Sequence, residues 1–517
     1  MTQPLTPAEL IAAFAEQNGS VALKPTTTST DPFFAYDRPE THGVHAEQVQ
    51  VPMRDGVHLS GELHRPANPD GTPTAGPFPG IVYEFNGYNS VPFFAAGAHH
   101  YVTRGYAVLV CNVRGTGGSP GTVDPFGLQE QNDNVDLIEW LAAQPFSTGK
   151  IGQMGVSYGG HNTMLAVVNQ APHLVTAIAA QSFSDWYDNT LYRGGIPNAQ
   201  IREWQRNTAP HTLETYPEHP LFDTYWQERS VKMRWDKVNI PVLDVGGWLD
   251  AYRVGMVENY LSNPDLFWMV AGPWQHGMMP GQFEDIAAAG YLAWWDYWLQ
   301  DDLAGLLPQV KVTSYEMPNH GWQQYTAWPP EQSQTTTWAT TSTGRLRRNG
   351  AQGGNGLAEA ASYMVFDARP PKESPDAPAQ DSPSGRLVFH TPHLEFDEVI
   401  VGAVEVSVRV AFSASDGHIA AILEDVAPDG TATRITNGWL KASHRDGDEE
   451  PAPVEPDTAY HLLVALWPAH HRVTAGHLLR LTISSSDYPQ IDDTAPPGTV
   501  TLQVGGDSCE LRYGVIA

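Results

Sequence analysis

Cysteine is scarce in this sequence, which holds only Cys111 and Cys509 among its 517 residues. The two lie far apart, and each stands in an apolar stretch typical of a β-strand. We therefore expect two buried free thiols rather than a disulfide. No cysteine and histidine spacing of a zinc site is present, so we predict no metal and no cofactor. A chain of this length can bury a large core without such a staple.

Basic side chains are also few. The chain has 29 Lys and Arg against 58 Asp and Glu, which gives a formal net charge of −29. Nucleic acids and anionic lipid surfaces are both bound by clustered Lys and Arg. We therefore expect neither a nucleic acid nor a membrane as a partner, and solubility is the simplest explanation of the acidic surplus.

Long apolar runs are missing as well. No uninterrupted run reaches the roughly 18 residues of a membrane span. The first residues also lack the basic and then apolar segments of a secretion signal. These absences predict a cytoplasmic protein, and whether it forms a homodimer stays open.

Between residues 44 and 306 the sequence alternates short apolar runs with helical patterns. Gly80–Phe85, Tyr106–Cys111 and Ile151–Val156 are examples of the apolar runs. Near-continuous apolar strands that alternate with helices predict a mostly parallel sheet covered on both faces, which is an α/β fold.

Two regions depart from this alternation. Residues 185–237 are rich in aromatic side chains, Asn, Arg and Pro, and predict a helical cap inserted over the active site. From residue 307, strand-like segments recur with turn signals such as Pro428-Asp-Gly and almost no helical pattern, which predicts a jelly-roll β-sandwich. The expected organisation is an N-terminal extension (1–43), an α/β core in two parts (44–184 and 238–306), a helical cap (185–237) and the sandwich (307–517).

The segment Gly155-Val-Ser157-Tyr158-Gly159 fits the G-x-S-x-G nucleophile elbow of α/β-hydrolases. A predicted strand leads into it and a predicted helix leads out. The serine of an elbow stands on a strained turn, so the residues two positions away on either side must be small. We predict that Ser157 is a nucleophile and that the backbone amide of Tyr158 points at the developing oxyanion.

A serine nucleophile needs a base and an acid that orients it, in the chain order Ser, acid, His. Asp250 follows the predicted strand that starts at Pro241, and His276 follows the next predicted strand. Both therefore qualify, and a histidine can accept and return a proton near neutral pH. Asp244 is the competing acid, but it lies inside a strand, where we expect it to be buried away from the site.

The second donor of an oxyanion hole is expected in the loop after the strand Gly80–Phe85. That loop contains Tyr88, whose hydroxyl could donate. Packing against neighbouring aromatic side chains is an equally good interpretation of Tyr88 from the residues alone.

Motifs spread along residues 45–517 resemble those of the cocaine-esterase and X-Pro dipeptidyl-peptidase group of serine hydrolases (CocE/NonD type). They are Val51-Pro-Met-Arg-Asp-Gly-Val, Tyr88-Asn, Arg114-Gly-Thr-Gly-Gly-Ser, Glu139-Trp-Leu-Ala-Ala-Gln-Pro-Phe, Gly155-Val-Ser-Tyr-Gly-Gly, Gly246-Gly-Trp-Leu-Asp, Gly272-Pro-Trp-Gln-His, Pro428-Asp-Gly and Gly476-His-Leu-Leu-Arg-Leu. The resemblance implies an α/β-hydrolase core, a helical cap and a C-terminal jelly roll. It also implies Ser157 as nucleophile, Asp250 as acid, His276 as base and Tyr88 as an oxyanion donor.

One departure from the family bears on the substrate. Relatives that hydrolyse α-amino acid esters hold the substrate ammonium with clustered carboxylates, two of them shortly after the triad acid. Tyr252 and Arg253 occupy those positions here, and Asp188 matches a third. Arg253 could bind a substrate carboxylate or carbonyl, but we favour its pairing with Asp188. Trp186, Asp188, Trp248 and Arg253 are the predicted substrate-binding residues.

These features predict a serine hydrolase that cleaves a carboxylic ester, or less favourably an amide, of a small molecule with a sizeable apolar or aromatic part. Three alternatives stay open. They are an acyltransferase with the same triad, an X-Pro dipeptidyl-peptidase or α-amino acid ester hydrolase, and a non-catalytic binding protein.

Overall fold

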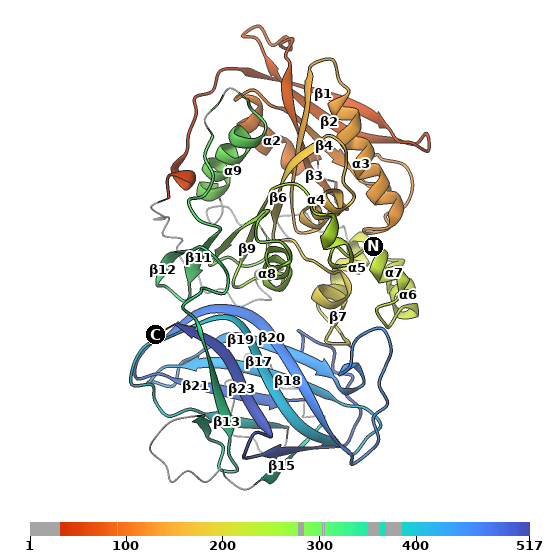
Figure 1. Cartoon of the computed structure of the whole chain (residues 1–517). Helices are drawn as coiled ribbons and strands as arrows, with labels where there is room; N and C mark the ends of the chain where they lie inside the picture. Colours follow the sequence, from red (N-terminus) through yellow and green to blue (C-terminus); the bar gives the residue numbers. More distant parts are fainter. Residues whose placement is uncertain are drawn as a thin grey trace.

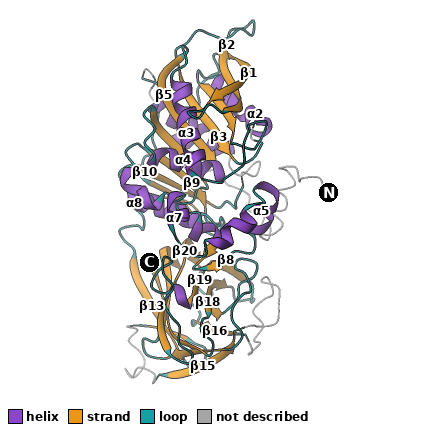
Figure 2. Cartoon of the chain, turned by 90° about the vertical axis from the view of Figure 1, so that its right-hand side faces the viewer, coloured by secondary structure: helices purple, strands orange, loops and turns teal. Residues whose placement is uncertain are grey.

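The computed structural model describes residues 31–89, 91–277, 284–301, 303, 305–349, 361–368 and 385–516. Most of the predicted N-terminal extension, up to residue 30, lies outside the described residues. The described chain forms an α/β body in the upper half of Figures 1 and 2 and an all-β body in the lower half. The predicted fold class, an α/β core followed by a β-sandwich, is confirmed.

A ten-stranded sheet forms the centre of the α/β body, in the order β1-β2-β4-β3-β5-β6-β9-β10-β11-β12. Neighbouring strands from β4 to β11 run parallel, and the remaining pairs are antiparallel. Every residue of β4 is buried, as its continuous apolar sequence predicts. The strands are β1 (Gly43–Pro52), β2 (His58–Ala67), β3 (Phe78–Asn86), β4 (Ala107–Asn112), β5 (Ser147–Val156), β6 (Leu174–Ala180), β9 (Val242–Gly247), β10 (Phe267–Gly272), β11 (Val312–Glu316) and β12 (Gly321–Tyr325).

Helices cover both faces of this sheet (Figure 1). Helices α2 (Val91–Val102) and α9 (Glu284–Trp298) contribute to one apolar core, and the short helix η1 (Pro32–Ala35) joins them through Phe33. Helices α3 (Leu128–Ala142), α4 (Tyr158–Val168) and α8 (Arg253–Ser262) contribute to the other. The sheet is therefore buried on both sides, and chemistry is expected at the carboxyl ends of its parallel strands.

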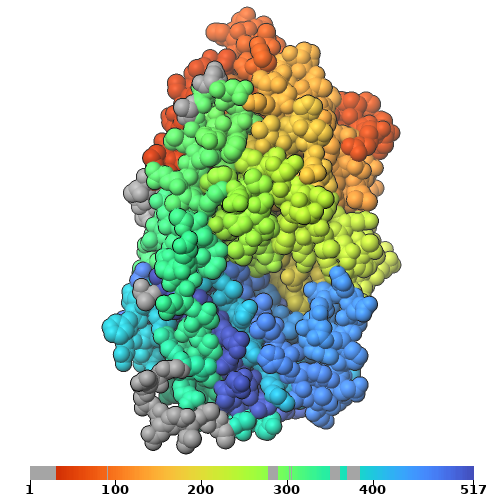
Figure 3. Space-filling view, in the orientation of Figure 1, coloured from red at the N-terminus to blue at the C-terminus, as the bar shows by residue number. Residues whose placement is uncertain are grey.

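Between β6 and β9 the chain forms a series of short elements. Their aromatic side chains Trp186, Tyr187, Tyr216 and Trp226 are buried and belong to the same apolar core as α4 and α8. Figure 3 shows this yellow-green region lying between the rest of the α/β body and the blue sandwich. The elements are η2 (Tyr187–Leu191), β7 (Tyr192–Arg193), β8 (Ile196–Pro197), α5 (Ile201–Thr208), α6 (Thr212–Thr215), η3 (Tyr216–Glu218), α7 (Thr224–Glu228) and η4 (Lys232–Lys237).

The all-β body consists of two sheets that enclose an apolar core of their own. One sheet has the order β14-β13-β23-β17-β22-β15, with β20 also paired to β17, and the other has the order β16-β21-β18-β19. Its elements are β13 (Gln334–Thr340), β14 (Leu346–Arg348), β15 (Ser362–Asp367), β16 (Arg386–His390), β17 (Glu398–Phe412), β18 (His418–Val426), β19 (Ala432–Lys441), η5 (Ala442–His444), β20 (Ala459–Val473), β21 (Leu478–Ser484), β22 (Thr499–Val504) and β23 (Cys509–Ile516).

The start of the sandwich differs from the predicted residue 307. Strands β11 and β12, at 312–325, pair with the core sheet through β10, and the first strand of the sandwich is β13. A strand pattern shows which residues alternate but not which sheet they join, so the sequence alone could not place this boundary.

Both cysteines are buried and free, as predicted. Burial raises the pKa of the Cys509 thiol to about 12 and that of Cys111 further still. Neither thiol is therefore a candidate nucleophile at neutral pH.

Candidate functional site

Ser157 stands on the turn between β5 and α4, with φ of +58° and ψ of −116°. This backbone conformation is strained for a residue other than glycine. A Cβ atom on Gly155 would lie 2.5 Å from the backbone of Gly159, and one on Gly159 would lie 2.5 Å from Oε2 of Glu84. The two glycines thus permit the close packing of strand, turn and helix that a nucleophile elbow requires.

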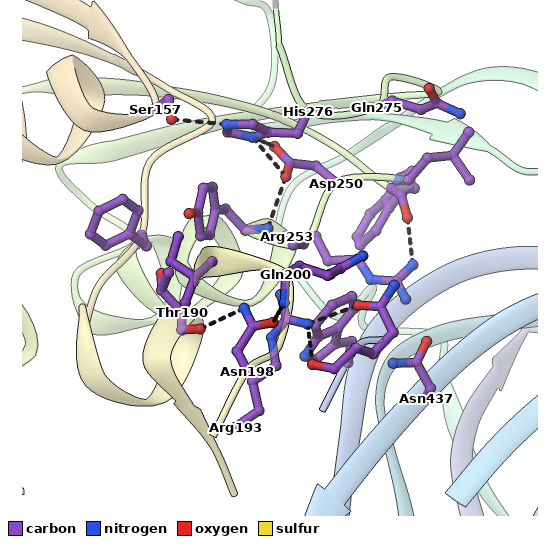
Figure 4. A pocket seen from close by; sticks show the side chains of 18 of the residues that line it. Ser157, Thr190, Arg193, Asn198, Gln200, Asp250, Arg253, Gln275, His276 and Asn437 are labelled. Atoms are coloured by element: carbon purple, nitrogen blue, oxygen red, sulfur yellow. Dashed lines mark hydrogen bonds and ion pairs between the residues drawn. The ribbon is translucent and has the colours of Figure 1, made fainter. Parts of the chain in front are cut away.

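Ser157, His276 and Asp250 form a chain of hydrogen bonds (Figure 4). The distance from Oγ of Ser157 to Nε2 of His276 is 2.8 Å, and Nδ1 of His276 lies 3.0 and 3.1 Å from the two carboxylate oxygens of Asp250. Ser157 follows β5, Asp250 follows β9 and His276 follows β10, so three parallel strands bring the side chains to one edge of the sheet. This is the arrangement of a nucleophile, a base and an orienting acid.

The carboxylate of Asp250 is fixed by its own loop. Its side chain is fully buried, and Oδ1 accepts a hydrogen bond of 3.0 Å from the backbone amide of Tyr252. The competing acid, Asp244, is buried inside β9, where the side-chain amide of Asn259 donates to it at 3.3 Å. Asp244 does not line the cavity that contains Ser157.

Tyr88 and Tyr158 line the same cavity as Ser157, and the centroids of their rings lie 6.2 Å apart. Asn86, the last residue of β3, accepts the backbone amide of Tyr88 at 3.0 Å and so fixes the loop. The indole of Trp204 donates to the Tyr88 hydroxyl oxygen at 2.8 Å. Tyr158 is the first residue of α4, so its amide has no acceptor within the helix.

Two buried carboxyl groups lie beneath the elbow. Glu84 accepts the backbone amide of Val156 at 2.9 Å, and Glu130 accepts the Tyr158 hydroxyl at 2.7 Å and the Asn162 amide at 2.8 Å. Burial raises the pKa of each carboxyl to about 8, against the opposing effect of these hydrogen bonds. Both groups are therefore mostly protonated at neutral pH and add little negative charge near the site.

A cavity of about 410 Å³ opens onto Ser157 and His276. Its walls come from all three parts of the molecule, and its apolar surface is mostly aromatic. The α/β core contributes Phe126, Phe183, Trp248 and Tyr252, the cap region contributes Trp186, Arg193, Asn198 and Trp204, and the sandwich contributes Arg434, Asn437, Trp467 and Gln490.

Three of the four predicted substrate-binding residues line this cavity, namely Trp186, Trp248 and Arg253. Asp188 does not, and its carboxylate accepts the backbone amide of Gly194 at 3.3 Å.

The favoured pairing of Arg253 with Asp188 is wrong. The Arg253 guanidinium instead donates to the backbone oxygens of Trp248 and Ile435, the latter at 3.4 Å. The guanidinium is therefore turned toward the sandwich, which supplies the carbonyl of Ile435 from β19. Arg253 and Ile435 are 182 residues apart in the sequence, so the sequence could not reveal this contact.

Several lining residues were not predicted. Arg193 and Trp204 stand in the cap region, whose aromatic composition indicated a cavity wall without singling them out. Arg434, Asn437 and Trp467 come from the sandwich, about 180 or more residues after Asp250 in the sequence, and no motif connects them with the triad. Only the packing of the two bodies brings them together.

No three His, Cys, Asp or Glu side chains of the described residues gather in a way that could hold a metal ion. Within the same part of the chain, no helix is long and apolar enough to cross a bilayer.

Two family models match the chain. That of the X-Pro dipeptidyl-peptidase (S15 family) matches residues 55–209 and 198–278. That of the X-Pro dipeptidyl-peptidase C-terminal non-catalytic domain matches residues 304–508. The first match contains Ser157, Asp250 and His276, and the second contains the sandwich residues of the cavity wall.

Curated proteins and solved structures agree with these matches. The chain is 24% identical to a cocaine esterase from Rhodococcus sp. (strain MB1 Bresler), over 88% of this chain and 93% of that protein. It is 23% identical to a putative Xaa-Pro dipeptidyl-peptidase from Bacillus cereus, over 79% and 75%. Its fold is similar to that of a CocE/NonD family hydrolase from Staphylococcus aureus, with a TM-score of 0.77, 18% identity and coverage of 97% and 100%.

An α-amino acid ester hydrolase has a similar fold, with a TM-score of 0.76, 19% identity and coverage of 96% and 100%. The matched regions span both the α/β core and the sandwich, in the same order as the motifs along the sequence. The chain is an enzyme that belongs to the cocaine-esterase and X-Pro dipeptidyl-peptidase family of serine hydrolases.

Proposed function

We propose that this enzyme hydrolyses a carboxylic ester of a small molecule through an acyl-enzyme on Ser157. Oγ of Ser157 attacks the substrate carbonyl carbon while Nε2 of His276 takes the hydroxyl proton. The tetrahedral intermediate collapses, the C–O bond to the alcohol breaks, and the imidazolium returns the proton to the departing alkoxide.

Water completes the cycle. It attacks the acyl carbon as His276 takes its proton, and the acid product leaves with Ser157 restored. Asp250 keeps the imidazole in the tautomer that accepts at Nε2 and stabilises its charged form. The Tyr88 hydroxyl and the Tyr158 amide stabilise the negative oxygen in both tetrahedral intermediates.

The observation that carries this proposal is the hydrogen-bonded chain from Ser157 to Asp250, on a strained elbow that opens into a cavity. The aromatic walls of that cavity favour a substrate with an apolar or aromatic part. An amide substrate and transfer of the acyl group to an alcohol or amine would use the same residues. Adding such an acceptor and measuring how the acyl-enzyme partitions between it and water separates transfer from hydrolysis.

Several relatives are named as X-Pro dipeptidyl-peptidases, and such a substrate carries a free amino group. Asp250 is the one carboxylate among the described residues that line the cavity, and it is engaged with His276. Positively charged arginines line the same space. This charge distribution disfavours an ammonium group and supports an ester without one.

Replacement of the nucleophile tests the proposal. We expect Ser157→Ala to lower hydrolysis of small aryl esters at least a thousandfold, with an unchanged circular dichroism spectrum, because no other group can form the acyl-enzyme. Ser182→Ala, a buried serine that does not line the cavity, is the matched control and should retain activity. Full activity of Ser157→Ala would refute the assignment.

A further inference from the structure

Two buried arginines line the catalytic cavity without a carboxylate partner. Arg193 is 4% exposed and Arg253 is 6% exposed. Neither forms an ion pair with any of the described residues, whereas Arg434, the third arginine in the wall, pairs with Asp487 at 3.2 Å. A buried charge without a directly bonded counter-charge is costly, even where carboxylates such as Asp250 act on it from further away. The pair therefore calls for an explanation.

Arg193 has unused hydrogen-bonding capacity. Its Nη1 donates to the backbone oxygen and to the side-chain oxygen of Gln490, both at 2.8 Å. Its Nε is buried and has no partner, and both hydrogen bonds of the guanidinium to described residues come from Nη1 rather than Nη2. Nε and Nη2 form one side of the planar guanidinium, which is the fork that binds a carboxylate with two parallel hydrogen bonds.

Arg253 adds a second positive charge. Its Nη1 donates to carbonyls of the core and the sandwich, its Nη2 lies 3.5 Å from Oγ1 of Thr436, and its Nε is buried without a partner. These contacts fix the guanidinium in place and neutralise none of its charge.

Tryptophan stabilises both cations. The ring of Trp467 lies 5.2 Å from each guanidinium carbon, and the ring of Trp439 lies 5.4 Å from that of Arg193. An aromatic ring face attracts a cation. It does not, however, accept the N–H bonds that a guanidinium donates in its own plane. Burial lowers the pKa of Arg193 to about 10 and that of Arg253 to about 9, against the opposing effect of the negative charge of Asp250 on both, so both stay charged at neutral pH.

The resulting positive charge contrasts with the rest of the molecule. The whole chain has a formal net charge of −29. Among the described residues that line the cavity, by contrast, there are three arginines, one aspartate, and no lysine or glutamate. In Figure 4, Ser157 and His276 lie at the top of the cavity, and Arg193 lies at the bottom beside the sandwich. Arg193 is thus separated from the reacting bond, and the Arg253 label lies between the two.

We propose that the Arg193–Arg253 pair binds a carboxylate of the substrate, so that the preferred ester carries a negatively charged group away from the scissile bond. This inference rests on the proposed function. The guanidinium of Arg193 binds the carboxylate directly, and the charge of Arg253 adds to the positive electrostatic potential there. The aromatic walls hold the part of the substrate between the carboxylate and the ester. The carboxylate can belong to the acyl or the alcohol part.

The test compares esters that differ in one charge. One pair has the carboxylate in the acyl part, namely p-nitrophenyl hydrogen glutarate and its methyl ester. The other has it in the alcohol part, namely 4-acetoxybenzoate and its methyl ester. We expect kcat/KM of the charged member to exceed that of the neutral member at least tenfold in one pair.

Arg193→Gln should lower this charged-to-neutral ratio at least tenfold, since a hydrogen-bonded ion pair is lost. Arg193→Lys keeps the charge without the fork and should give an intermediate ratio. Arg54→Gln removes an exposed arginine outside the cavity and should leave the ratio as in the wild type. The inference is wrong if neither charged ester is preferred, or if the preference survives Arg193→Gln.

A binding measurement separates this inference from the proposed function. Calorimetry with glutarate on the Ser157→Ala protein reports on the arginines without any turnover. If no ester is hydrolysed through Ser157, the proposed function fails, while glutarate binding that is lost in Ser157→Ala/Arg193→Gln still supports the anion site. Absence of both turnover and glutarate binding overturns the anion site as well.

Discussion

The structure adds more to the interpretation of Tyr88 than to that of any other predicted site residue. The residues alone left its role open between an oxyanion donor and a packing aromatic. In the structure it lies in the cavity wall, its loop is fixed by Asn86, and its hydroxyl oxygen accepts from Trp204. A phenolic O–H in the wall of the cavity that contains Ser157 is consistent with the proposed stabilisation of an oxyanion.

We therefore expect Tyr88→Phe to lower kcat for aryl esters roughly 100-fold or more, which is the usual effect of removing one oxyanion donor, with little change in KM. Steady-state kinetics measures this split. Tyr363→Phe, on an exposed tyrosine of β15, is the matched control and should behave as the wild type. A Tyr88→Phe enzyme with unchanged kcat would show that the ring only packs.

The sequence predicts catalytic residues better than binding residues. Ser157, Asp250 and His276 each follow a strand of one parallel sheet, so motif and strand order together place them at one edge. Arg253 has no such constraint, because its partners are backbone oxygens that no residue pattern reveals. Arg193 has a partner, Gln490, that lies 297 residues further along the chain, and no residue pattern connects the two.

At the scale of elements, the turn between β5 and α4 is supported by protonated carboxyl groups. Glu84 and Glu130 hold the amide of Val156 and the hydroxyl of Tyr158, and burial raises the pKa of each to about 8. In the unfolded chain both would ionise near their ordinary pKa of 4.5. Unfolding thus releases protons between about pH 4.5 and 8.

The sign of the effect on stability follows. The contribution of each group is fully present below pH 4.5, falls as the pH rises, and is lost once the pH passes about 8. Each raised pKa therefore lowers the free energy of unfolding by up to about 1.4 kcal/mol per pH unit within this window.

Glu130→Gln removes one titrating group and retains an acceptor for Tyr158. We expect the free energy of unfolding of this variant to fall with pH by about 1 kcal/mol per unit less than that of the wild type. Urea denaturation at several pH values between 5 and 8 measures it. Glu331→Gln, at an exposed position, provides the baseline, and an equal slope in both variants would contradict the account.

Element positions were largely predictable because the core strands are apolar along their length and the helices separate them. The pairing of β11 and β12 was not, since an alternating pattern fits an edge of the core sheet as well as a sandwich. The cap illustrates a further limit. Its short helices and strands are held by buried aromatic side chains and show no regular helical periodicity. The composition therefore predicts a cap, but not the course of the backbone within it.

At the scale of the whole molecule, the sandwich is part of the catalytic cavity. Strand β20 is hydrogen-bonded through its backbone to Met317, the residue after β11. The amide of Met317 donates to the carbonyl of His470 at 3.0 Å, and the amide of Arg472 donates to the carbonyl of Met317 at 2.9 Å. The Arg472 side chain also pairs with the buried Glu316 of β11. These contacts hold Arg434, Asn437 and Trp467 against the core.

Arg472→Gln should lower the melting temperature by a few degrees, because it leaves the buried carboxylate of Glu316 without its closest cation. Since the cavity needs both bodies, the loss of esterase activity on heating should shift by the same amount. Calorimetry and residual activity measure the two. Arg409→Gln, an exposed arginine on β17, is the control. Activity that outlasts unfolding of the sandwich would show that the core works alone.

The order of the domains could be predicted from where strand-like and helical patterns occur in the sequence. That the α/β core and the sandwich line one cavity could not be predicted. Trp467 and Arg434 stand in ordinary strand and turn patterns, and their role depends on how two separate apolar cores pack together. The acidic surplus of the chain likewise gave no sign of a positively charged cavity, because composition averages over a surface that is mostly remote from the site.

Covalent labelling tests the central claim most directly, that Ser157 is the nucleophile of a serine hydrolase. The protein is treated with a p-nitrophenyl phosphonate, which an activated serine attacks with release of p-nitrophenol, and peptide mass spectrometry locates the adduct. We predict one phosphonyl group per chain, attached to Ser157, together with complete loss of esterase activity. An inactivated enzyme labelled at another residue, or an active one labelled at Ser157, would contradict the account.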